Sequence, residues 1–159
     1  MSKTAVKKKQ TMLLGRVSMR LTENKCISFA LTEYAIQNNK PIPSNGYIFN
    51  FNASFAAIPN EKAVRVIMTA KLFEKKEPQE NILLAELVAI HVFTILNFSE
   101  VIKYDAIRKM NLIPDPLISL CNNITLNSVR GMYSVKLENT IYNNAIVPLM
   151  HTNALSPKK

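Results

Sequence analysis

The residues of this 159-residue chain that could perform covalent or acid–base chemistry do not fall in a recognisable catalytic pattern. Its only histidines are His91 and His151. Nucleophilic catalysis needs a nucleophile, a base and a group that orients the base, all within hydrogen-bond reach. His91 lies inside an apolar run and His151 near the end of the sequence, so we interpret them as a core and a surface imidazole. The histidines therefore indicate no catalytic site.

The acidic residues and glycines also fail to form a recognisable site. Paired carboxylates can act as acid and base only when they share a cleft. Glu74, Glu77 and Glu80 fall in a charged stretch around Pro78, which is typical of a solvated hairpin tip, and Glu86 stands alone in an apolar run. Three glycines are present, and none belongs to a phosphate-binding loop. We expect no enzyme and no cofactor.

The cysteines and the apolar runs indicate a cytoplasmic protein with reduced thiols. Cys26 and Cys121 are too few and too far apart for a disulfide framework or a zinc site, so no metal is expected. The apolar run at Met12 is ended by Arg16, well short of a signal peptide. No apolar run is long enough to span a membrane, because polar groups interrupt the longest candidate.

The net charge of +9 comes from the two ends of the chain. Residues 1–25 hold seven Lys or Arg against Glu23 alone, and Lys158 and Lys159 close the sequence. The length of the chain fits a single domain over residues 1–159. The charge distribution predicts basic flexible tails at about 1–10 and 152–159. The alternative is a basic arm that binds nucleic acid through charge, a contact that weakens with salt. No aromatic or cysteine–histidine motif accompanies it.

Alternating side chains predict antiparallel strands in the middle of the chain. Tyr47 to Ala57 places aromatic and small apolar residues on one face and Asn50, Asn52 and Ser54 on the other. A second strand is predicted over 63–73 and a third over 82–95. The third is apolar on both faces, so one face would pack on a helix. The other would form an exposed apolar patch, which indicates oligomerisation or client binding.

The ends of the sheet and the main helix are predicted from local signals. Two short strand segments, 12–21 and 25–31, flank Thr22 to Asn24, and residues 99–110 are interpreted as a short helix. Asp115 as N-cap and Pro116 at the first helical position start a longer helix. Its apolar face continues to Arg130 and Gly131, where a left-handed glycine is expected to end it.

Several short motifs, taken in order, resemble the SecB family of export chaperones. They are Ile27-Ser28-Phe29, Thr69-Ala70-Lys71-Leu72-Phe73-Glu74, Leu84-Ala85-Glu86-Leu87, Val92-Phe93-Thr94-Ile95, Ser128-Val129-Arg130-Gly131 and Ile146-Val147-Pro148-Leu149. Each motif is unspecific alone, and their order and spacing carry the resemblance.

The resemblance implies an α+β fold: a four-stranded antiparallel sheet with one long helix, about residues 115–131, packed on one face. It implies assembly as a homo-oligomer, a dimer of dimers. It also implies an ATP-independent holdase that binds unfolded or precursor polypeptides in apolar grooves and passes many of them to the SecA motor. The expected groove residues are Tyr34, Ile36, Ile42, Phe49, Phe51 and Phe55; the alternative for the three phenylalanines is plain core.

Departures from the family pattern leave the partner open. Cys26 and Ala30 stand where the family has acidic residues that help to meet SecA; Glu74 keeps one matching acid, and the next becomes Lys75. The family's second helix is expected to be short or missing after Met150. SecB-like proteins also include dedicated chaperones of toxin–antitoxin systems, and that role is the alternative to export.

Overall fold

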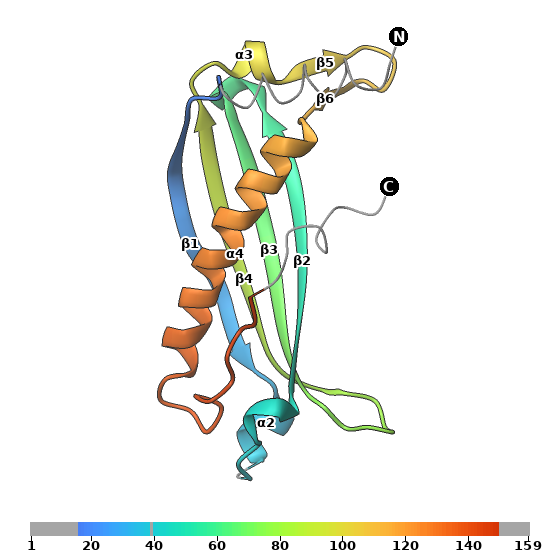
Figure 1. Cartoon of the computed structure of the whole chain (residues 1–159), viewed down its shortest axis with the longest axis vertical. Coiled ribbons are helices and arrows are strands. Elements are labelled where there is room, and N and C mark those ends of the chain that lie inside the picture. Colours follow the sequence, from blue (N-terminus) through green and yellow to red (C-terminus); the bar gives the residue numbers. More distant parts are fainter. Residues whose placement is uncertain (1–15, 39, 150–159) are drawn as a thin grey trace.

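The computed structural model describes residues 16–38 and 40–149, which form a sheet crossed on one face by a long helix (Figure 1). The strands are β1 (Met19–Leu31), β2 (Tyr47–Ile58), β3 (Ala63–Glu74) and β4 (Ile82–Ile95). All neighbours are antiparallel, in the order β1-β4-β3-β2. The predicted four-stranded α+β architecture is confirmed. The predicted basic tails, at about 1–10 and 152–159, lie outside the described residues.

β2 and β3 form a regular hairpin. A short 3-10 turn, Pro59–Glu61, connects them, and Lys62 adopts the left-handed conformation (φ 50°) that reverses the chain. The pairing runs from Tyr47 opposite Glu74 to Ile58 opposite Ala63 without interruption. The predicted alternation therefore sets the register, since a slip by one residue would exchange the buried and exposed faces of the strand.

The two predicted N-terminal strand segments are one strand in the structure. β1 runs through Thr22 to Asn24, and it accommodates them with a register shift between Leu21 and Glu23. The hydroxyl of Thr22 donates to the carbonyl of Val92 at 3.2 Å. Polar residues are tolerated at this point of the strand because β1 is at the edge of the sheet, and a bulge lets the strand bend without leaving the sheet. Residues 12–15 of the predicted first segment are outside the described range.

A crossover and a small hairpin occupy opposite ends of the sheet (Figure 1). Between β1 and β2 lies helix α2 (Glu33–Gln37), capped by Thr32, whose hydroxyl accepts from the Ala35 N–H at 3.2 Å. A 3-10 turn, Ser44–Gly46, leads into β2. After β4 the chain forms α3 (Phe98–Val101), β5 (Lys103–Asp105) and β6 (Met110–Leu112). The short helix predicted over 99–110 is therefore mostly wrong, because β5 and β6 pair as a hairpin.

Helix α4 (Asp115–Leu137) is longer than predicted. It begins after Pro114, which makes no side-chain cap, so Asp115 is in the first turn and is not the N-cap. The predicted stop at Gly131 is wrong, since Gly131 is inside the helix and has no positive φ. Tyr133 and Leu137 are buried beyond it. Their burial outweighs the helix cost of one glycine, which is about 1 kcal/mol.

The core lies between α4 and the sheet in two clusters. One surrounds Tyr133, with Leu72 and Leu87 from the sheet; the other surrounds Phe93 and Leu117. The opposite face of the sheet has no cover within the described residues. Its apolar side chains are half-buried by one another and include Ile67, Phe73, Val88 and Ile90. Both faces of β4 are thus apolar, as predicted, but mutual packing of neighbouring strands reduces the exposed patch.

Candidate functional site

An uncharged apolar groove runs along β2 at the end of the sheet that carries the β5–β6 hairpin. We call it the β2 groove. Its volume is about 680 Å³. Its lining includes Ala53, Phe55, Ala57, Met110, Leu112 and Ile118. The groove exists because β6 and the first turn of α4 stand beside the edge strand β2. Met110 and Leu112 are 51% and 37% exposed, so the groove offers apolar surface that an incoming chain could bury.

A second, smaller hollow lies at the opposite end of the sheet, in the crossover between β1 and β2. We call it the crossover pocket. Its volume is about 310 Å³, and its lining includes Tyr34, Lys40, Pro41, Ile42, Glu74 and Lys76. Unlike the β2 groove, it combines charged groups with apolar walls.

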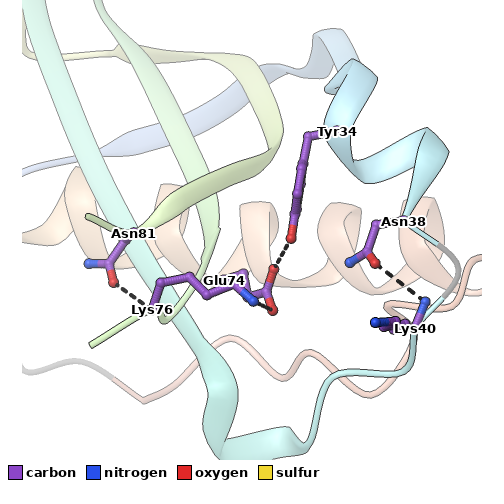
Figure 2. A network of polar contacts seen from close by, with 6 residues as sticks. All are labelled: Tyr34, Asn38, Lys40, Glu74, Lys76 and Asn81. Atoms are coloured by element: carbon purple, nitrogen blue, oxygen red, sulfur yellow. Dashed lines mark hydrogen bonds and ion pairs between the residues drawn. The ribbon is translucent and has the colours of Figure 1, made fainter. Parts of the chain in front are cut away.

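Glu74 is the centre of the polar contacts at the crossover pocket (Figure 2). Its carboxylate accepts from the Tyr34 hydroxyl at 2.7 Å and pairs with the Lys76 ammonium at 2.7 Å. Burial alone would raise the pKa of this carboxyl, but the bonds from Lys76 and Tyr34 outweigh it and lower the pKa. The bond to Glu74 in turn raises the pKa of the Tyr34 phenol. These contacts tie α2 to the end of β3.

The six residues expected to line a groove do not form one surface. Tyr34 and Ile42 meet at the crossover pocket, where Ile42 is buried, and Ile36 on α2 is 66% exposed. Phe51 is buried in the core, and the ring of Phe49 packs edge-on against Tyr133 with centroids 5.5 Å apart. Phe55 is the only one of the six that lines the β2 groove. For Phe49 and Phe51 the structure agrees with the core alternative.

Glu74, expected to contact a partner, has a side chain that is 11% exposed and already paired within the chain. A partner would have to displace Lys76 or Tyr34 to reach it. Cys26 and Ala30 lie on β1, the edge strand farthest from β2.

Sequence reasoning missed the groove residues contributed by β6 and the start of α4. The sequence pattern predicts a helix over 99–110 and no strand at Met110 to Leu112, so it does not identify these two residues as part of a groove. A signal for the hairpin was present in Asp105, whose carboxylate accepts from the N–H groups of Ile107 and Arg108 at 2.8 and 3.1 Å. Aspartate favours turns for this reason. Lys109 then adopts a positive φ of 52°.

Buried polar groups elsewhere do not form a metal site. Across residues 16–38 and 40–149, no group of three or more His, Cys, Asp or Glu side chains could hold a metal ion. His91 is fully buried beneath α4, and within the same residues neither ring nitrogen has a hydrogen-bond partner. Burial lowers the pKa of its imidazole. None of the helices described here has the length and apolar character needed to cross a membrane.

The sheet order, the long helix on one face and the crossover define a SecB-like fold. Comparison with solved structures finds this fold in the SecB-like chaperone Rv1957 of Mycobacterium tuberculosis, in complex with a ChAD peptide from the Rv1956 HigA1 antitoxin. The similarity covers 92% of this chain and 99% of that chain, with a TM-score of 0.56 and 10% sequence identity. No protein-family model matches the sequence. No curated protein sequence matches it either.

Proposed function

We propose that this protein is an ATP-independent chaperone that holds non-native polypeptide segments in the β2 groove. The observation that carries the proposal is the uncharged groove of about 680 Å³ beside the edge of β2, in a chain with a SecB-like fold. Unfolded chains expose apolar side chains, and their burial in such a groove is favourable without any energy input. The function requires no catalytic residues and no cofactor.

An aggregation assay with a matched pair of variants tests this function. A chemically unfolded client is diluted into buffer with or without the protein, and light scattering is followed. Leu112→Asp places a charge in the groove, whereas Ile141→Asp places one on a residue of similar exposure, 41% against 37%, in the turn after α4. We expect the wild type and I141D to suppress scattering and L112D to lose suppression. Unchanged scattering with equimolar wild-type protein would contradict the function.

A narrower clientele is the second candidate, and two observations favour it. The similar mycobacterial chaperone is bound to a peptide from an antitoxin. In addition, Cys26 and Ala30 replace acids of the export family, and Glu74 is engaged within the chain. This role predicts one preferred partner and no binding to SecA. Affinity capture that returns many precursor proteins would favour export instead.

The proposed holdase acts in the cytoplasm as a dimer of dimers. Its two cysteines are free thiols, which fits a reducing compartment. Leu120 and Val135 on α4 are 38% and 69% exposed and offer apolar surface for contact between copies. Multi-angle light scattering of the purified chain measures the mass directly, and a monomer at micromolar concentration would refute the assembly.

A further inference from the structure

We propose that the β5–β6 hairpin docks the protein on an anionic lipid bilayer. Ile107 enters the interfacial region of the bilayer, and the basic residues around it contact the lipid phosphates. This inference goes beyond the chaperone function, because the turn of the hairpin, residues 106–109, does not line the β2 groove.

The apex of the hairpin presents an aliphatic side chain to solvent. Ile107 lies in the turn between β5 and β6 and is 94% exposed, and Tyr104 on β5 is 63% exposed. Asp105 shapes the turn, because its carboxylate accepts from the N–H groups of Ile107 and Arg108 at 2.8 and 3.1 Å. Lys109 closes the turn with a positive φ of 52°. Ile107 is therefore held outward by a turn with its own hydrogen bonds.

Basic side chains surround the exposed isoleucine. Arg108 and Lys109 follow it in the turn, and Lys103 begins β5. Asp105 is the only acidic residue among 103–112, and it lies 3.7 Å from Arg108, whose side chain is 69% exposed. The hairpin thus combines a net positive charge with an apolar apex. This combination is typical of segments that bind at the surface of anionic membranes.

Arg16 and Lys62 add basic side chains at the same end of the sheet (Figure 1). Lys62 is in the turn between β2 and β3, and the carbonyl of Arg16 accepts from the side-chain amide of Asn97, just after β4, at 2.6 Å. Both basic residues are exposed. Glu61 and Glu100 are exposed acids of the same end. Together with the hairpin, this end keeps an excess of positive charge.

The charges of the chain also distinguish the two ends of the sheet. Residues 1–15, which precede Arg16, contain four lysines and no acidic residue. The opposite end, which is formed by residues 33–46 and 74–81, contains three basic and four acidic residues. An anionic surface would therefore attract the hairpin end and orient the molecule upon it.

A bilayer fits this surface better than a protein or a nucleic acid. A stable protein interface buries roughly 800 Å² on each partner, which is more than one short turn provides. Single-stranded nucleic acids stack on several aromatic rings, and Tyr104 is the only aromatic residue among 103–112. An aliphatic apex adds nothing to contacts with phosphates in water. In a bilayer, Ile107 is buried while Arg108 and Lys109 remain at the headgroups.

Tryptophan fluorescence tests whether the apex enters a bilayer, since the protein contains no tryptophan. Ile107→Trp is compared with Ile36→Trp, which changes an isoleucine that is 66% exposed on α2 at the other end of the sheet. The probes are vesicles of phosphatidylcholine alone and of equal parts of phosphatidylcholine and phosphatidylglycerol. We expect the emission of I107W to move to shorter wavelength with the mixed vesicles only, and that of I36W to stay unchanged. No shift in I107W, or an equal shift in both variants, would overturn the proposal.

Co-sedimentation with the mixed vesicles measures affinity, and circular dichroism checks that each variant folds. Ile107→Ser should bind at least about fivefold more weakly than the wild type, because it loses the burial of an apolar side chain. Arg108→Gln/Lys109→Gln should bind at least about tenfold more weakly, because each cation near an anionic surface strengthens binding about fivefold. The control Lys75→Gln/Lys136→Gln removes two exposed lysines away from the hairpin and should bind within about twofold. Equal binding by the wild type and all variants would refute docking through the hairpin.

Two further measurements separate the bilayer from other occupants. A wild type that binds a labelled single-stranded RNA and not the mixed vesicles would refute the proposal and assign the basic end to nucleic acid. A smaller mass for I107S than for the wild type in multi-angle light scattering would show that a second copy covers Ile107, which would also refute it. In the aggregation assay I107S should match the wild type, because Ile107 does not line the β2 groove. Loss of suppression in I107S would place the hairpin apex in client binding and would contradict a separate membrane surface.

Discussion

The buried imidazole of His91 makes a quantitative prediction about stability and pH. His91 is on the helix-facing side of β4, opposite Asn24 of β1 and Val66 of β3, and is 0% exposed. Because burial lowers its pKa, the folded protein keeps the ring neutral at pH values where the unfolded chain binds a proton. Stability is therefore full above the unfolded pKa of 6.5 and falls as the pH drops below it.

The size of the loss follows from proton linkage. At about pH 5.5 the protonated form of the imidazole in the unfolded chain exceeds the neutral form by about tenfold. If the ring stays neutral in the folded state, the free energy of unfolding is therefore lower by up to about 1.4 kcal/mol than at about pH 7.5. The lowered pKa of Glu74 keeps that carboxylate ionised over this range, since its usual value is 4.5. The loss of stability between these two pH values should therefore come from His91.

Urea unfolding at these two pH values, followed by circular dichroism, measures the effect. His91→Phe is the control, because phenylalanine fills the site without titrating and without buried nitrogens. We expect the wild type to lose about 1 kcal/mol at the lower pH and H91F to lose little. H91F should also be at least as stable as the wild type near neutral pH. A wild type that is equally stable at both pH values, or an equal loss in H91F, would refute the reasoning.

Three further predictions concern stability and thiol reactivity. Gly131→Ala should raise the free energy of unfolding in urea by up to about 1 kcal/mol, because Gly131 is helical and an added Cβ meets nothing within 4 Å. Gly46→Ala is the control and should not stabilise the protein, since its Cβ would lie 2.7 Å from Ile42 Cγ2. Tyr133→Phe should destabilise by about 0.5–1.5 kcal/mol in the same assay, because its hydroxyl donates to the Ala70 carbonyl at 2.8 Å; no change would show that the bond contributes nothing. In a thiol titration of the folded protein, Cys26 should react and Cys121 should not, since burial raises the pKa of Cys121 to about 12; rapid reaction of both without denaturant would contradict the buried assignment.

The sheet was predictable where local pattern and tertiary structure agree. In β2 and β3 the alternation of side chains coincides with one buried face, so the strands and their pairing followed from the sequence. β1 was divided wrongly because Thr22 to Asn24 is polar, and only the position of β1 at the edge makes that tolerable. The local sequence predicts a helix end at Gly131, because the packing of Tyr133 and Leu137 against the sheet is not visible in local spacing.

The candidate site was harder to predict than the fold. Alternation placed Phe49, Phe51 and Phe55 on one face but could not show how far α4 covers that face. The helix packs over Phe49 and Phe51, and Phe55 lies beyond them beside β6. The groove depends on a hairpin of two strands of three residues each, which carries too short a pattern to be recognised before the fold is known.

The strand order has a consequence for the time course of folding. β2, β3 and β4 follow one another in the chain and pair as neighbours, whereas β1, which the ribosome makes first, pairs with β4, as in Leu31 opposite Ala85. Closing that long loop costs chain entropy before its contacts form, so we expect the three-stranded meander to appear first and β1 to join it last. Pulse-labelling hydrogen exchange during refolding should protect the amides of β3 before those of β1. Until β4 emerges, the first strand made has no partner in its own sheet.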